Sequence, residues 1–331
     1  MNNVSPTIVT FSITRQCNLN CKHCYSRASS FPSPDELSTN EAVRVLDEIK
    51  AAGTMMIIFD GGEPTLRSDL LQLISHAAEI GLIPILGTNG TTMTLEMAVE
   101  LKKAGLKICA VSLDGATAKT HDDFRNVPGS FEDALRGIEY LKEAGIPFQV
   151  NPCVHSLNYH EIPDLLSFAQ ELGAVGVEIF EFIATGRGRS DSTLGVDKKL
   201  QVVEQILEYS KTTNMTTRMI GIPQFDILYR QNNDSSYRQG CCGAGRSIAC
   251  IFNDGTVYPC MLMQMPVGNV RENSFVDIWN DSIILNKLRN RENLKGKCGR
   301  CFRRDECGGA RCKAYINGDF LSEDPDCQYL M

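Results

Sequence analysis

The sequence predicts an α/β protein: a partial (β/α)6 barrel followed by a small cysteine-rich domain. Between residues 7 and 213, apolar runs of strand length alternate with amphipathic helices, which is typical of a parallel sheet covered by helices. A full (β/α)8 barrel takes about 250 residues, so this region favours six units. Beyond residue 240, cysteines become dense and strong helix patterns become rare. On pattern alone, an open doubly wound sheet fits as well.

The six predicted strands are short β-rich or apolar runs: Thr7–Thr14, Met55–Phe59, Ile83–Gly87, Lys107–Leu113, Phe148–Val154 and Val177–Ile183. Ser38 and Glu41 form a capping box that opens the first helix, in which Ala42, Val45, Leu46 and Ile49 fall at helical spacing. The later helices are predicted at Asp69–Ile80, Thr94–Ala104, Phe131–Ala144, His160–Leu172 and Asp197–Thr213. We therefore expect a barrel core over residues 1–190, a linking helical region over 191–240 and a cysteine-rich domain over 241–331.

Composition excludes several classes of protein. A net charge of −7 argues against a nucleic-acid-binding surface along the whole chain. No apolar run reaches 18 residues, and the first residues carry no secretory pattern, so we expect a cytoplasmic protein with no membrane span. Inside a cell, 14 cysteines indicate metal or redox duty rather than a disulfide framework.

Three cysteines lie directly after the first predicted strand, spaced Cys17-x3-Cys21-x2-Cys24. Thiolates are the usual ligands of iron–sulfur clusters, which normally take four. A cluster held by three protein ligands keeps one metal position open for chemistry. A zinc site and scattered buried thiols are the alternatives.

Further unusual residues follow the next strands, at the carboxyl ends where parallel α/β proteins place their sites. They are Gly61-Gly62-Glu63-Pro64, Thr88-Asn89-Gly90, Asp114-Gly115 and Gly186-Arg187-Gly188-Arg189. Each taken singly is also compatible with a plain turn. Their shared position favours one functional site.

These motifs resemble those of the radical S-adenosylmethionine (SAM) enzymes, in which the open iron binds the cofactor. The resemblance implies that Gly61, Gly62, Glu63 and Pro64 receive the amino group of the cofactor. It places Asn89, Ser112 and Asp114 along the ribose and His23 beside the adenine. Arg187 or Arg189 would hold the carboxylate of the cofactor as a fork, although either could equally hold an acidic substrate.

The later cysteines resemble the SPASM extension of this family, which carries two auxiliary [4Fe–4S] clusters. Transferred residue by residue, one cluster is held by Cys298, Cys301, Cys307 and Cys327. The other is held by Cys242, Cys260 and Cys312, with Cys250 as the favoured fourth ligand; Cys241 or no fourth ligand are the alternatives. The spacing before Cys312 is x4 instead of the usual x3. Three [4Fe–4S] clusters and SAM are thus the expected cofactors, with a pair of zinc sites as the alternative for the extension.

The segment Lys287–Lys313 has a net charge of +7. Cations are expected near an anionic cluster, and Arg303, Arg304 and Arg311 would also suit a polycarboxylate substrate; a solvated basic face is the plain alternative. Cys109 and Cys153 have no partner spacing and are expected to be small apolar residues. His155 ends the fifth predicted strand and could reach the site.

The resemblance implies an enzyme that cleaves SAM to a 5′-deoxyadenosyl radical, which takes a hydrogen atom from the substrate. Sequences over Val267–Phe275, Asp277–Trp279, Leu294–Gly299 and Gly318–Pro325 resemble the branch that removes or alters side chains of haem-type tetrapyrroles in haem and haem d1 biosynthesis. A peptide maturase and a non-enzymatic electron carrier are the alternatives. A low-potential donor such as flavodoxin or ferredoxin is the expected protein partner, and no catalytic residue beyond the cluster is identified.

Overall fold

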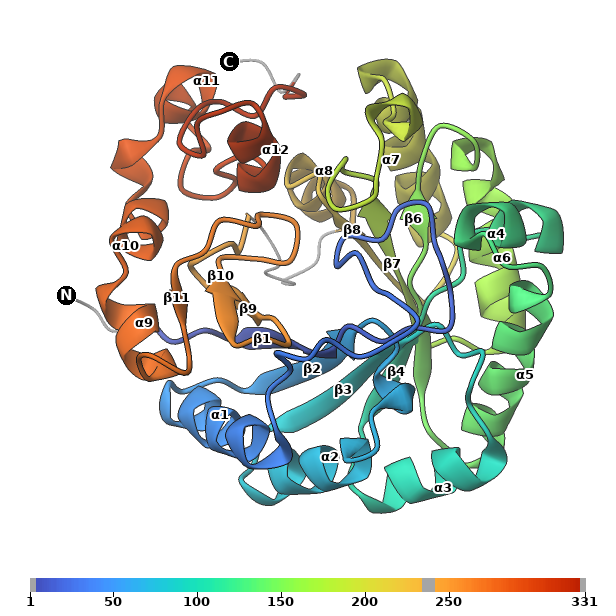
Figure 1. The fold of residues 1–331 in the computed structure, drawn as a ribbon. Helices are drawn as coiled ribbons and strands as arrows, with labels where there is room; N and C mark the ends of the chain where they lie inside the picture. The colour runs from blue at the N-terminus through green and yellow to red at the C-terminus, as the bar shows by residue number, and fades with distance from the viewer. Residues whose placement is uncertain (1–3, 234–241, 328–331) are drawn as a thin grey trace.

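A single sheet organises the protein. The computed structural model describes residues 4–233 and 242–327, and within these ranges all eleven strands belong to one sheet (Figure 1). The strands of the parallel part are β1 (Ile8–Thr14), β2 (Met56–Gly61), β3 (Ile83–Thr88), β4 (Ile108–Val111), β5 (Phe148–Val150), β6 (Cys153–Val154), β7 (Gly176–Glu181) and β8 (Thr216–Ile220). This confirms the predicted partial barrel.

Helices follow the strands and cover the outside of the sheet (Figure 1). They are α1 (Thr39–Ala51), α2 (Leu70–Glu79), α3 (Leu95–Lys103), α4 (Ala118–Arg125), α5 (Ser130–Glu143), α6 (Ile162–Leu172), α7 (Val196–Ser210) and α8 (Gln224–Asn233). The capping box of α1 is present, because Ser38 accepts from the Glu41 backbone and Glu41 accepts from the Ser38 backbone. None of the helices in the described ranges is long and apolar enough to cross a membrane.

The fifth predicted strand is divided into β5 and β6. Pro152 lies between them and has no N–H to donate to a neighbouring strand. Its carbonyl still accepts from the Phe180 backbone, and both short strands pair with β7. The division turns the chain at the end of β6, just before His155.

The region expected to be a helical link, residues 191–240, carries a strand as well as helices. β8 pairs in parallel with β7 from Gly176↔Thr216 to Phe180↔Ile220. The described part of this region therefore extends the barrel sheet, because Thr217 and Met219 continue the alternating burial of a strand. Residues 234–240 lie outside the described ranges.

The cysteine-rich part begins by extending the opposite edge of the same sheet. β9 (Ile248–Ile251) pairs in parallel with β1, and β10 (Thr256–Tyr258) and β11 (Gly268–Asn269) follow as antiparallel strands. Four short helices complete this part: α9 (Phe275–Asp281), α10 (Ile283–Arg289), α11 (Gly296–Arg300) and α12 (Arg311–Ile316). Figure 1 shows α9 and α10 beside the β9–β11 edge of the sheet, with α11 and α12 beyond them and α12 on the side of α8.

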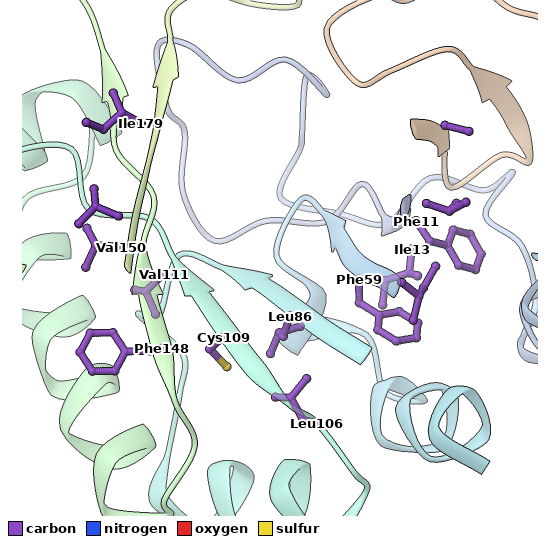
Figure 2. Packing of buried hydrophobic residues seen from close by; sticks show 14 of the residues in the cluster. Phe11, Ile13, Phe59, Leu86, Leu106, Cys109, Val111, Phe148, Val150 and Ile179 are labelled. Atoms are coloured by element: carbon purple, nitrogen blue, oxygen red, sulfur yellow. The ribbon is translucent and has the colours of Figure 1, made fainter. Parts of the chain in front are cut away.

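The core lies between the strands and the helices. Phe11, Ile13, Phe59 and Leu86 are fully buried there, in contact with apolar side chains of the covering helices (Figure 2). Cys109 belongs to this core, as predicted for a small apolar residue. Thr10, Ser12 and Thr14 alternate with the apolar residues of β1 and are also buried. The other face of the sheet is therefore a polar interior, which leads up to the strand ends.

Candidate active site

The cysteine loop begins where β1 ends. Cys17 and Cys21 are buried and Cys24 is half-buried, and the three thiols form one group with Leu19 and Ala28. Burial raises the pKa of Cys17 to about 12, and the neighbouring Glu63, Cys21 and Cys24 also raise it. Three thiolates cannot gather here unless a positive group compensates them. A metal centre provides that compensation, because metal ligation releases the thiol protons.

The surroundings of the three sulfur atoms fit an anionic cluster. The backbone N–H of Leu19 lies 3.4 Å from Cys17 Sγ, and the N–H of Ala28 lies 3.3 Å from Cys24 Sγ. Arg125 Nη1 lies 3.8 Å from Cys21 Sγ. Donors and a guanidinium directed at sulfur stabilise thiolates, so Cys17, Cys21 and Cys24 can hold a cluster that leaves one iron open to a cofactor.

The glycine loop packs directly against the cysteine loop. The backbone N–H of Gly62 donates to Thr14 O and that of Glu63 donates to Gln16 O, both at 2.7 Å. A Cβ at Gly62 would lie 2.1 Å from Gln16 O, so only glycine allows this approach. Pro64 is buried at the start of the short 3-10 helix Pro64–Leu66. The loop thus lies at the edge of the site predicted for the amino group of the cofactor.

Glu63 is fully buried, and its carboxylate is used by the protein. It accepts from the Thr65 backbone and hydroxyl, from the Thr88 hydroxyl at 2.7 Å and from the Asn89 backbone at 2.8 Å. Its side chain therefore ties the glycine loop to the end of β3. The carbonyls of Gly61, Glu63 and Pro64 also accept hydrogen bonds, from Ser26, Leu66 and Arg67.

Asn89, Ser112 and Asp114 lie at the ends of β3 and β4, as the sequence predicted. Asn89 Nδ2 donates to Asn18 on the cysteine loop at 3.0 Å, and Ser112 is half-buried beside Thr88 O. Asp114 is buried and paired with Arg125, with Oδ2 2.6 Å from Nε. Burial raises the pKa of Asp114, but the Arg125 guanidinium, the two histidines His23 and His121 and the Cys153 N–H together outweigh it and lower that pKa to about 2.

Arg125 is the residue of this site that sequence reasoning missed. It ends α4, a short helix that we did not predict, between the Thr117 N-cap and the left-handed Asn126 C-cap. Those caps were the available signal, but the polar sequence between them lacks a clear apolar stripe. Arg125 joins Asp114 of the ribose side to Cys21 of the cluster loop.

His23 is one ring of a three-ring stack. It lies on Phe124 at a centroid distance of 4.0 Å, and Phe124 lies on His155 at 3.7 Å. Two nearly parallel rings this close to a third must occupy its opposite faces, so Phe124 is sandwiched. Burial lowers the pKa of His23 to about 3 and that of His155 to about 4. Both rings are therefore neutral, and the far face of His23 is the one left for an adenine.

Arg187 and Arg189 have different environments. Arg187 Nε donates to Cys21 O at 3.1 Å and Nη1 donates to Ala28 O at 2.6 Å. Its Nη2 is buried and has no hydrogen-bond partner among the described residues. Arg189 is exposed and its Nε lies 3.5 Å from Asp191. Gly186, at φ 59°, turns the chain against Cys24 O, so Arg187 is the arginine held beside the cluster loop.

Four of the later cysteines line one cavity, together with Lys297, Arg303 and Arg304: Cys298, Cys301, Cys307 and Cys327. The backbone N–H of Asp324 lies 3.3 Å from Cys298 Sγ, and that of Gly309 lies 3.4 Å from Cys307 Sγ. The structure thus gathers the four cysteines that the sequence assigned to one cluster.

Arg311 contacts Cys298 from outside the lining of this cavity and is too buried to meet a substrate, contrary to our expectation. It is fully buried and donates to the carbonyls of Gly309, Phe320 and Ser322. Its Nη2 also lies 3.4 Å from Cys298 Sγ. A buried guanidinium requires a compensating anion, and a thiolate cluster at this position would supply one.

Cys242, Cys260 and Cys312 form the other group. Burial, and then the charges of Cys260 and Cys242, raise the pKa of the Cys312 thiol. Cys250 lies on β9, and its pKa is raised by burial, then by Asp60 of β2 and then by Cys260. Its surroundings therefore include β2 as well as this cysteine group. Cys241, the alternative fourth ligand, lies outside the described residues. Among those described, no three His, Cys, Asp or Glu side chains are positioned to share a single metal ion.

Family models match both halves of this arrangement. Residues 11–169 match the radical SAM superfamily, and residues 241–302 match the SPASM iron–sulfur cluster-binding domain. The chain belongs to the radical SAM enzymes with a SPASM domain. It is an enzyme that uses a [4Fe–4S] cluster and SAM.

Full-length relatives place the chain more closely. It is 37% identical to the "AdoMet-dependent heme synthase" of Nitratidesulfovibrio vulgaris, over 98% of this chain and 93% of that protein. It is 35% identical to the protein of the same name from Methanosarcina barkeri, over 98% and 97%. In fold it is similar to Streptococcus suis SuiB bound to S-adenosylmethionine, with a TM-score of 0.78 at 19% identity, over 98% of this chain and 78% of that one.

Proposed function

We propose that this enzyme oxidatively removes carboxylate side chains from a haem-type tetrapyrrole. The observation that carries the proposal is the relation to heme synthases at 35–37% identity over nearly the whole chain. Proteins named Fe-coproporphyrin III synthase and pre-heme d1 synthase are 32% and 28% identical. All three names describe tetrapyrrole chemistry.

The residues divide the work as follows. Cys17, Cys21 and Cys24 hold the first cluster, with Arg125 beside the sulfur of Cys21. His23 would offer one ring face to the adenine, Asn89, Ser112 and Asp114 would lie along the ribose, and Gly61–Pro64 would receive the amino group. Arg187, through its buried Nη2, would hold the cofactor carboxylate. When bound, the reduced cluster and SAM supply a radical that removes a hydrogen atom from the substrate.

The reaction must also dispose of a carboxylate and an electron. Converting a propionate into an alkene after hydrogen abstraction releases CO2 and one electron. We propose that each of the two auxiliary cysteine groups holds a [4Fe–4S] cluster, and such a cluster could accept that electron. Lys22 and Arg27 are exposed on the cysteine loop and suit the other carboxylates of such a substrate.

The test is anaerobic reconstitution followed by turnover. An iron porphyrin with four propionates should be converted to products that lack one or more carboxyl groups by mass spectrometry, with 5′-deoxyadenosine formed in step. Cys21→Ala should abolish both. Three clusters predict about twelve iron atoms per chain; about four would refute both auxiliary sites.

A peptide maturase is the second candidate. The chain is 29% identical to a PqqA peptide cyclase of Bradyrhizobium diazoefficiens, and its fold matches SuiB bound to the precursor peptide SuiA with a TM-score of 0.79. Peptide turnover would be read as loss of two hydrogens with all carboxyl carbon retained. Such a product, with no porphyrin decarboxylation, would overturn the tetrapyrrole proposal.

A further inference from the structure

Arg311 is a buried cation directed at one cysteine sulfur. Its side chain is fully buried, and Nη2 lies 3.4 Å from Cys298 Sγ. Its other donors meet backbone carbonyls, at 3.2 Å for Gly309, 3.0 Å for Phe320 and 2.6 Å for Ser322. No carboxylate of the described residues lies within ion-pairing distance of it. The guanidinium is thus fixed by neutral partners, and its charge is left to act on the sulfur.

Asp324 is the charged group on the other side of this sulfur. Its backbone N–H donates to Cys298 Sγ at 3.3 Å, but its carboxylate is turned to other partners. These are the backbone of Ala310 at 2.8 Å and of Asp326 at 3.1 Å, and Gln224 Nε2 at 3.3 Å. The Asp324 carboxylate is thus held by backbone and amide donors, while the Arg311 guanidinium contacts the Cys298 sulfur directly.

The cysteine group Cys242, Cys260 and Cys312 has a different electrostatic setting. The buried cations beside it are Lys313, which lies 2.6 Å from Glu181 and 3.0 Å from Asp326, and Arg291, whose Nη2 donates to Cys242 O at 3.0 Å. Lys313 is compensated by two carboxylates, and Arg291 is directed at a carbonyl oxygen. The N–H of Leu262, 3.3 Å from Cys260 Sγ, is a neutral backbone donor. Cys298, by contrast, has a guanidinium in direct contact with its sulfur.

We propose that Arg311 raises the reduction potential of the cluster held by Cys298, Cys301, Cys307 and Cys327 above that of the other auxiliary cluster. The proposal rests on the two auxiliary clusters of the proposed function. A cubane gains a negative charge on reduction, so a fixed cation and N–H donors at its sulfurs favour the reduced form. Cys301 and Cys327 are half-exposed, and solvent acts in the same direction. An electron that reaches the SPASM domain then rests on this cluster.

The experiment is a potentiometric titration of the full chain, reconstituted anaerobically and followed by electron paramagnetic resonance without substrate. Cys301→Ala identifies the signal of this cluster. Arg311→Met should shift its potential downward, and Arg311→Lys should shift it less, because the charge is kept. Asp324→Asn should shift it upward. Arg300→Met, which removes an exposed arginine from the same module, is the matched control and should leave the potential unchanged.

Potential shifts of opposite sign in Arg311→Met and Asp324→Asn indicate an electrostatic effect. Loosened packing would instead shift the potential in the same direction in both variants, or lose iron from both. Shifts of the same sign, or a shift in Arg311→Met no larger than in Arg300→Met, overturn the proposal. If Arg311→Met loses the cluster, the signs for Arg311→Lys and Asp324→Asn decide. An iron content of about four atoms per chain would show that the auxiliary clusters are not bound and would overturn this proposal. Failure of porphyrin turnover alone would leave the measured potentials standing.

Discussion

Arg187 and Arg189 are two residues apart and were equal candidates for the cofactor carboxylate. Arg187 is fixed by Cys21 O and Ala28 O, and one of its buried nitrogens has no partner in the part of the chain that the structure describes. Arg189 is 84% exposed on its side chain and is solvated. A guanidinium fixed in advance, here with Nη2 as the remaining donor, loses less entropy on binding an anion than a free side chain does. Burial therefore favours Arg187.

We expect Arg187→Lys to weaken SAM binding by about ten-fold or more, since a hydrogen bond to a charged group contributes roughly 1.5–3 kcal/mol. Equilibrium dialysis of labelled SAM against the reconstituted enzyme measures it. Arg189→Lys is the matched control and should change the dissociation constant by less than about two-fold. Iron content of both variants must equal that of the wild type. Equal weakening in the two would contradict the assignment.

At the scale of elements, α4 positions the groups that the strand ends do not supply. It carries Phe124, the middle ring of the stack, and Arg125, which contacts Cys21 of the cysteine loop. Asp122 holds α4 to α5, because its carboxylate accepts from the Gly129 backbone, the Ser130 hydroxyl and the Phe131 backbone. A short helix with little apolar surface depends on such contacts.

We expect Asp122→Ala to lower the free energy of unfolding by about 2 kcal/mol, as for loss of a helix cap that satisfies several donors. Urea titration measures the change. Burial raises the pKa of Asp122, but hydrogen bonds from Gly129 and Phe131 lower it below its usual value. The stabilisation by the Asp122 carboxylate is therefore fully present above the unfolded-state pKa of about 4. It is lost as pH falls through the lowered folded-state pKa. The wild type and the variant should converge in acid, and a constant difference would exclude the carboxylate as the cause.

At the scale of the whole molecule, a buried charge cluster joins the barrel to the SPASM domain. Lys199 Nζ lies 2.7 Å from Glu181 and 2.6 Å from Asp326, and Lys313 Nζ lies 2.6 Å and 3.0 Å from the same two carboxylates. Glu181 ends β7, while Lys313 and Asp326 each adjoin a proposed cluster ligand. This buried group of charged side chains therefore fixes both auxiliary cysteine groups relative to the strand ends.

Glu181→Gln should destabilise the protein by about 3 kcal/mol, because two buried ammonium groups would then share one carboxylate. We expect faster limited proteolysis between the barrel and the SPASM domain, read by mass spectrometry of the fragments. Glu208→Gln breaks an exposed pair with Lys211 and should change stability by less than about 1 kcal/mol. If both variants resist protease like the wild type, the cluster does not hold the two parts together.

The barrel could be predicted because its signals are local. Phe11 and Ile13 alternate with polar residues within one strand, and Ala42, Val45, Leu46 and Ile49 mark one helix face. α4 was not predicted because its sequence has no apolar stripe, and β8 was not predicted because the region around it was expected to be helical. Cys17, Cys21 and Cys24 were recognisable for the same reason: eight residues contain the whole ligand set.

The sequence by itself determined the strand order along the chain, the cluster loop and the residue types at the strand ends. The tertiary structure decided which identical groups do different work. It buried Arg311 against Cys298, paired Arg125 with Asp114, and fixed Arg187 beside the cysteine loop while leaving Arg189 exposed. The physical reason is that burial and charge compensation depend on residues far apart in the chain, such as Glu181 and Asp326, and no local pattern records their distance.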